Sequence, residues 1–136
     1  MSTDLIRPIL IGHPDVFSLT GFTYGVGQKE IRCWRVMPPA GQTIQLPYLI
    51  YADTGGVDAV PVNSFRSFQV VSWGSDEIEC QTLSKAVKSA LKDFSGEVNS
   101  TLIEGISQTF FQDALYESST GFWYSIRKFS ILYEED

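Results

Sequence analysis

The chain offers more apolar strand surface than its one long helix can cover. Residues 46–53 read LPYLIYAD and are apolar on both faces as far as Asp53, which is typical of a strand covered from two sides. In residues 122–133, both alternating sets of side chains are again rich in apolar and aromatic residues. One helix covers only one face of a sheet, so the other face has to meet solvent, a loop or another subunit. Packing by the long N-terminal loop and assembly with further copies both stay open on this pattern.

The clearest helix is expected after residue 75. Asp76 is a suitable N-cap, and Glu79 three residues later completes a sequence typical of a capping box. Apolar residues then recur on one side of a 3.6-residue helix, namely Ile78, Leu83, Val87, Ala90, Leu91 and Phe94. Ser95 and Gly96 are expected to end this helix.

The remaining pattern is mostly extended. Residues 3–11 predict a short N-terminal helix, and the glycine-rich residues 12–27 predict a loop with one short strand. Further strands are expected over residues 31–37, 46–53, 65–73, 101–111 and 122–133, the second and third of them forming an antiparallel hairpin. The expected fold class is therefore α+β: a mostly antiparallel sheet with one long amphipathic helix packed on it and a short N-terminal helix, in one domain over residues 1–136.

Composition excludes several classes of function. Sixteen acidic residues against ten Lys and Arg give a net charge of −6, the opposite of the basic surface that non-specific DNA binding needs. A hydrophobic content of 43% excludes a disordered chain. No secretory signal and no apolar run long enough for a membrane span is seen, so we expect a protein that is cytosolic when made, with no membrane partner.

Catalytic and metal-binding patterns are weak. Cys33 and Cys80 lack metal-ligand or redox spacing, and His13 is the only histidine. We therefore expect no catalytic residue, no metal and no cofactor, and His13 is interpreted as a loop residue near the end of the first helix. Gly25 to Lys29 lack the spacing of a phosphate-binding loop. A basic stripe of Lys85, Lys88 and Lys92 is interpreted as a solvated helix face, although three lysines could also contact phosphates.

The order of these features resembles a known family. A short N-terminal helix is followed by the strand LPYLIY at residues 46–51, which ends near Gly55 and Gly56. The strand FQVVSW and its Ser-Trp-Gly junction at residues 72–75 lead into the helix, and a closing strand follows Thr120. In these respects the chain is similar to the tail completion and tail terminator proteins of tailed bacteriophages over nearly its whole length, whereas residues 12–27 depart from the compact version of the family.

The resemblance implies a structural virion protein rather than an enzyme. Such a protein forms a homo-oligomeric ring, commonly of six subunits, that caps the head-proximal end of the tail tube and ends its polymerisation. Its partners would be further copies of itself, the tail tube protein and the head connector or head-completion protein, with genome DNA passing through the lumen without sequence-specific contacts. It would be located in the virion, and in the host cytoplasm during assembly. Another small head-tail connector component and a small α+β ligand-binding domain are the alternatives.

Within this resemblance, residues 55–63 are the first candidate for a contact with the tube or a neighbouring subunit. Two glycines allow the segment to bend, and its valines are unusual for a free loop. The candidate interface residues are Gly55, Gly56, Val57, Asp58, Val60 and Val62. The alternative interpretation of the same segment is an ordinary hairpin tip.

Overall fold

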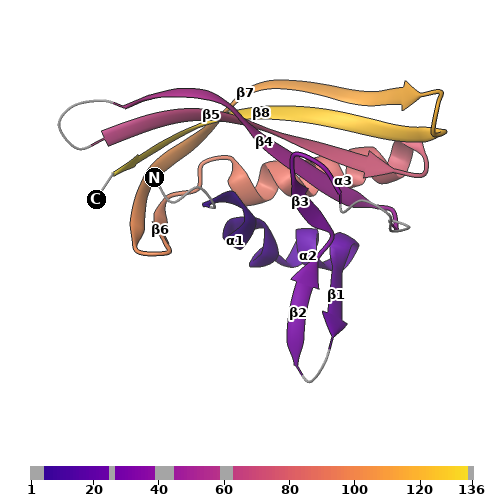
Figure 1. Cartoon of the computed structure of the whole chain (residues 1–136), viewed down its shortest axis with the longest axis horizontal. Coiled ribbons are helices and arrows are strands. Elements are labelled where there is room, and N and C mark those ends of the chain that lie inside the picture. The colour runs from indigo at the N-terminus through magenta and orange to yellow at the C-terminus, as the bar shows by residue number, and fades with distance from the viewer. Residues whose placement is uncertain (1–4, 25–26, 39–44, 59–62, 135–136) are drawn as a thin grey trace.

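A curled six-stranded sheet packs over three helices in the computed structural model of the chain (Figure 1). The structure describes residues 5–24, 27–38, 45–58 and 63–134. The elements are α1 (Ile6–Ile11), α2 (Pro14–Thr20), β1 (Gly21–Tyr24), β2 (Gln28–Ile31), β3 (Cys33–Arg35), β4 (Tyr48–Asp58), β5 (Asn63–Gly74), α3 (Glu77–Leu91), β6 (Gly96–Val98), β7 (Thr101–Glu117) and β8 (Phe122–Glu134). The sheet order is β3-β4-β5-β8-β7-β6, and only the β3–β4 pair is parallel. The expected α+β class is therefore confirmed.

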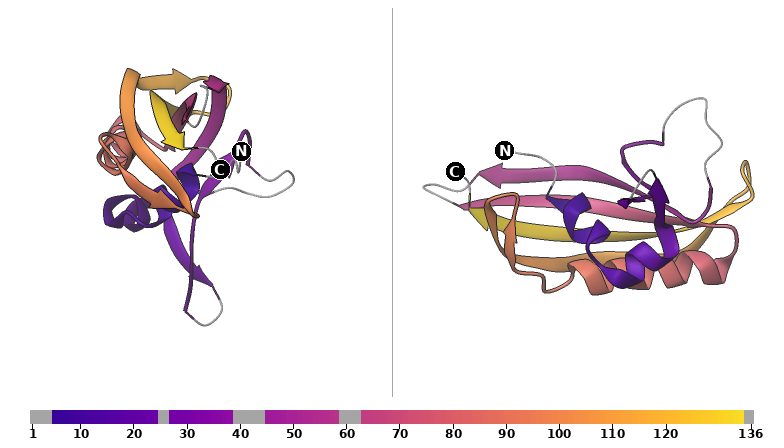
Figure 2. Two further views of the ribbon diagram at one scale, coloured as in Figure 1. Left: turned by 90° about the vertical axis from the view of Figure 1, so that its left-hand side faces the viewer. Right: turned by 90° about the horizontal axis from the view of Figure 1, so that it is seen from below.

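The centre of the sheet is regular and its flanks are not. β5 and β8 pair without interruption from Asn63 opposite Glu134 to Gly74 opposite Trp123. In contrast, the β7–β8 register shifts three times, and the β4–β5 register shifts once, between Asp53 and Gly55. Each shift marks a bulge or irregularity, and bulges bend a strand and increase its twist. The curl of the sheet around the helices is visible in Figure 2.

All described helices lie on one face of the sheet, which we call the inner face (Figures 1 and 2). Side chains alternate between this face and the opposite, outer face. In β5, Phe68 and Val70 are buried in the core, and Phe68 stacks on Phe129 of β8 with ring centroids 5.4 Å apart. Phe68 and Val70 thus belong to the inner-face set of β5, and Phe129 to that of β8.

The start of α3 follows the prediction and its end does not. Asp76 Oδ1 accepts a hydrogen bond of 2.7 Å from the Glu79 backbone N–H, and Glu79 Oε1 accepts one of 2.9 Å from the Ser75 N–H. The helix ends at Leu91, before the expected Ser95 and Gly96. Phe94 still packs against the core, but from a turn in which Asp93 has a positive φ and its N–H bonds to the Ile106 carbonyl. Apolar spacing alone therefore overstates the length of the helix.

The glycine-rich residues 12–27 are more ordered than predicted. Instead of a loop with one strand they contain α2 and β1, and β1 pairs with β2 in a hairpin that projects from the body of the molecule (Figure 1). Pro14 occupies the first helical turn, where its missing N–H costs nothing. Val16 and Thr20 of α2 are fully buried. The glycines at 12 and 21 thus flank a helix rather than form a loop.

Three predicted strands have different bounds in the structure. The strand expected over residues 31–37 is divided between the end of β2 and β3, because Arg32 turns away to donate hydrogen bonds to the carbonyls of Leu19 and Pro47. The strand expected over 46–53 begins at Tyr48, after a cis Leu46–Pro47 bond, and runs on to Asp58. The strand expected over 101–111 continues to Glu117. The short β6 was not predicted.

Candidate assembly interface

The predicted interface segment is mostly strand. Gly55, Gly56, Val57 and Asp58 belong to β4, where their backbones pair with Ser67, Arg66, Phe65 and Ser64 of β5. Val60 and Val62 lie outside the described residues. Residues 55–58 are thus a continuation of the β4 strand.

One outer edge of the sheet is uncovered along part of β4. Its neighbour β3 pairs only with Leu49, Ile50 and Tyr51, and one further hydrogen bond joins the Val36 N–H to the Tyr51 carbonyl. Over residues 53–58, no described strand pairs with this edge. Its N–H and C=O groups are therefore available to another strand.

The opposite edge is uncovered along most of β7. β6 pairs only with residues 101–103, and the Ile106 carbonyl accepts from Asp93. Beyond that point, no described strand pairs with the edge of residues 107–117. Three large apolar side chains of this stretch are exposed: Phe110 by 44%, Phe111 by 55% and Tyr116 by 55%. Soluble monomers normally protect such an edge, so its exposure indicates a contact surface.

A basic cleft of about 500 Å³ lies between α3 and β7. It is lined by Lys85, Lys88, Ser89, Lys92, Phe111, Asp113 and Arg127, which we call the lysine cleft. The sequence predicted a solvated face for these lysines, and in the structure Lys85 and Lys92 are exposed and Lys88 is half-buried. All three line one open cleft together with a buried arginine. None of the three forms an ion pair with a described residue.

Arg127 is the buried base of the lysine cleft. Its side chain is 5% exposed. Its Nε donates to Ser84 Oγ at 2.7 Å and its Nη1 to Gln108 Oε1 at 2.8 Å, while Asp113 Oδ1 lies 4.0 Å from Nη2. Burial lowers the pKa of this guanidinium, and the Asp113 charge opposes that shift. Arg127 therefore holds the wall of the cleft together, and the lysines remain as the groups that can bind a partner.

The outer face carries an aromatic ladder of Trp34, Tyr48, Trp73 and Tyr124. Successive ring centroids are 5.8, 6.0 and 4.7 Å apart across β3, β4, β5 and β8. A hollow of about 410 Å³ beside the ladder is bounded by Val36, Pro38 and Glu117 among others. Burial, and secondarily the Glu117 charge, raises the pKa of Tyr48. The second sheet face is thus partly covered by its own aromatic rings.

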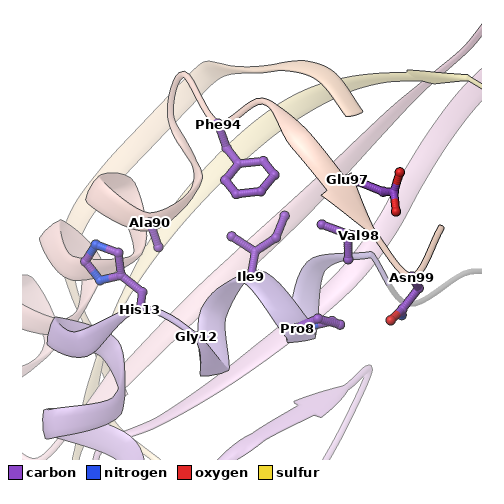
Figure 3. A pocket seen from close by; sticks show the side chains of 9 residues that line it. All are labelled: Pro8, Ile9, Gly12, His13, Ala90, Phe94, Glu97, Val98 and Asn99. Atoms are coloured by element: carbon purple, nitrogen blue, oxygen red, sulfur yellow. The ribbon is translucent and has the colours of Figure 1, made fainter. Parts of the chain in front are cut away.

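Another recess lies between α1, α3 and β6 (Figure 3). It has a volume of about 460 Å³, with Ile9 and Phe94 in its wall, His13 at one end and Asn99 at the other (Figure 3). His13 stands between α1 and α2 as the residue before α2, close to its predicted place. Its buried Nδ1 has no hydrogen-bond partner among the described residues. No described nucleophile is hydrogen-bonded to this nitrogen.

Within the described ranges, no group of three or more His, Cys, Asp or Glu side chains is placed to hold a metal ion. No helix in the described part of the chain combines the length and apolar character that crossing a membrane requires. Cys33 and Cys80 are both buried.

Comparison with known proteins finds a likeness of fold. The sequence matches no protein-family model, and no curated protein matches it. A chain in the solved structure of the virion of a native gene transfer agent particle has a similar fold, with a TM-score of 0.59 and 12% sequence identity. The similarity covers 76% of the present chain and 79% of the other one. At this identity it is the fold that the two chains share.

Proposed function

We propose that this chain is a structural virion protein that caps the head-proximal end of a phage tail tube as a homo-oligomeric ring. The observation that carries the proposal is the fold shared, over 76% of the chain, with a component of a virion particle. The sequence resemblance to tail terminator proteins supports this particular role within the virion. The ring would end tube polymerisation and offer its other side to the head connector.

Two uncovered sheet edges support a ring. A head-to-tail contact uses different surfaces on each copy, and it closes into a ring when the rotation between copies closes. Residues 53–58 and 107–117 provide two such different surfaces within the described chain. A protein acting alone would leave both edges open to uncontrolled association.

The proposal is tested by adding the purified protein to tail tubes. Light scattering measures the mass of the free protein and negative-stain imaging locates added density. We expect density at one tube end only and, for the assembled form, a ring near six copies. A protein that stays monomeric and ignores tubes under all conditions would contradict the proposal, and density at the portal instead would favour a connector component.

The predicted interface segment is tested in the same assay. Deletion of Asp58 to Pro61 is expected to leave the monomer folded and to abolish assembly, because it shortens only the end of the β4–β5 hairpin. Near-UV circular dichroism and a thermal melt check the fold. Normal rings from the deleted protein, or an unfolded product, would count against a role of this segment in assembly.

A further inference from the structure

The two uncovered edges lie at opposite ends of the sheet. The register aligns Asp53 of β4 with Phe68, Phe68 with Phe129, and Phe129 with Gln108 of β7. From this level, the free stretch of β4 runs toward Asp58 and the free stretch of β7 runs in the other direction along the sheet, toward Glu117. At each end of the sheet, one edge is uncovered and the other is covered. β6 covers β7 at the end where β4 is free, and β3 covers β4 at the end where β7 is free.

The strand directions suit pairing between copies. β4 is antiparallel to β5, β5 to β8 and β8 to β7, so β7 runs antiparallel to β4. A second copy in the same orientation would thus bring its β4 antiparallel to the β7 of the first. Because the free stretches are offset, the second copy has to slide along the strand direction before they meet, and a stagger of this kind is what a sheet closing on itself requires.

The free edge of β7 lies beside the positively charged lysine cleft. Lys85, Lys88 and Lys92 line the lysine cleft next to the free edge, and Phe111 and Asp113 of that edge form its other wall. Alternate side chains of a strand added to β7 would point toward this cleft. With Arg127, the cleft holds four of the ten basic residues and one acidic residue, Asp113, which leaves six basic residues against fifteen acidic ones elsewhere in the chain.

We propose that the free edge of β7, with the lysine cleft, binds residues 53–58 of β4 from a second copy of this chain. That stretch contains two acidic residues, Asp53, which is ion-paired with Arg35 of its own chain at 3.0 Å, and Asp58, together with two glycines that place no side chain in the way of a close approach. Pairing of two β7 edges would bring two lysine clefts together, so like charges disfavour that symmetric contact. The inference rests on the proposed function and names its subunit contact.

Cross-linking tests the contact directly. Cysteines are introduced by Asp58→Cys and Gln112→Cys in one chain, and rings assembled on tail tubes are treated with a short bifunctional thiol reagent. The native Cys33 and Cys80 are buried and remain in place. We expect a ladder of covalent oligomers from the double variant, whereas each single variant stays monomeric in denaturing gels.

Charge reversal provides a second readout. Lys88→Glu with Lys92→Glu is expected to weaken assembly by at least about tenfold in protein concentration, and adding Asp58→Lys should recover most of it. Lys29→Glu, in β2 of the projecting β1–β2 hairpin, is the matched control and should assemble normally. Near-UV circular dichroism confirms that each variant is folded.

The outcomes separate the two proposals. Rings that assemble without the cross-link and ignore the charge changes would overturn this contact and leave the proposed function standing. Failure of the wild-type protein to assemble on tubes would overturn the proposed function and the contact with it. Retention of double-stranded DNA at physiological salt, lost on lysine reversal, would assign the cleft to nucleic acid instead.

Discussion

Arg127 and Ser84 join β8 to α3 through a hydrogen bond of 2.7 Å between two buried side chains. Removing the Ser84 hydroxyl leaves Arg127 Nε without its acceptor in the core, although Nη1 keeps its bond to Gln108, and an unpaired buried donor costs more than the bond itself contributes. Ser84→Ala is therefore expected to lower the free energy of unfolding by about 1–3 kcal/mol. Urea titration measures the change.

A double-mutant cycle isolates this pair. Arg127→Met combined with Ser84→Ala should cost less than the sum of the two single changes, because neither polar group is then left unpaired. Lys128→Met, at the exposed neighbouring position, is the control and should change stability by no more than about 0.5 kcal/mol. Strict additivity of the two core changes would contradict the interaction.

The N-cap of α3 gives a second prediction. Asp76→Ala removes the acceptor of the Glu79 N–H and should lower the free energy of unfolding by about 1 kcal/mol. Asp76→Asn keeps a suitable cap and should retain most of the stability. Chemical denaturation of both variants checks the contrast, and equal losses would show that charge rather than capping is responsible.

Gly74 is required by the close approach of β5 to α3. A Cβ atom built at this position would lie 2.6 Å from the backbone N of Cys80, whereas one at Gly105 meets nothing within 4 Å. Gly74→Ala is expected to cost about 1–3 kcal/mol through overpacking. Gly105→Ala, also within a strand, should be nearly neutral. Thermal melts of the two variants decide the matter, and similar midpoints would contradict the packing argument.

Stability is expected to fall in alkaline solution. Burial above all raises the pKa of Cys80, and burial also raises the pKa of Tyr48. Both groups are neutral when protonated, so above the thiol pKa of the unfolded chain, about 8.5, the folded state retains protons that the unfolded state has lost. The protonated groups therefore favour folding below that pH, and the advantage is lost as the pH rises.

Thermal melts between neutral and alkaline pH test this expectation. The melting temperature of the wild-type protein should fall more steeply with pH than that of Cys80→Ala, which has no thiol to ionise there. Tyr48→Phe should flatten the decline only at the higher end of the range. Parallel curves for all three proteins would show that neither group is responsible.

Elements that depend on interactions between residues close in the chain, such as the N-cap of α3 and alternating strands, were predicted correctly from the sequence. The cap at Asp76 and the alternation of β5 and β8 are readable because each depends on neighbouring residues. α2 was missed because Pro14 and two flanking glycines are also typical of a loop. The far half of β7 was missed because register shifts at Gln108/Phe110 and Gln112/Leu115 break the alternation that identifies a strand.

The candidate interface depends on tertiary relationships that spacing does not encode. The three lysines were visible as a stripe, but the cleft forms only where β7 passes beside α3 and buries Arg127. The uncovered edges arise because β3 and β6 are short, each pairing at three positions. Strand length at a sheet margin is set by where the chain turns away, and the composition of β4 or β7 gives no sign of it.

The difference between a regular centre and bulged flanks bears on which insertions and deletions this fold can absorb. One residue added to β5 or β8 would exchange core and outer side chains along the rest of an uninterrupted pairing. In β7, the existing register shifts already take up extra residues, so one more can be confined between two of them. Related chains should therefore vary in length along β7 and keep β5 and β8 constant, and the surface that differs most between them would be the one beside the lysine cleft.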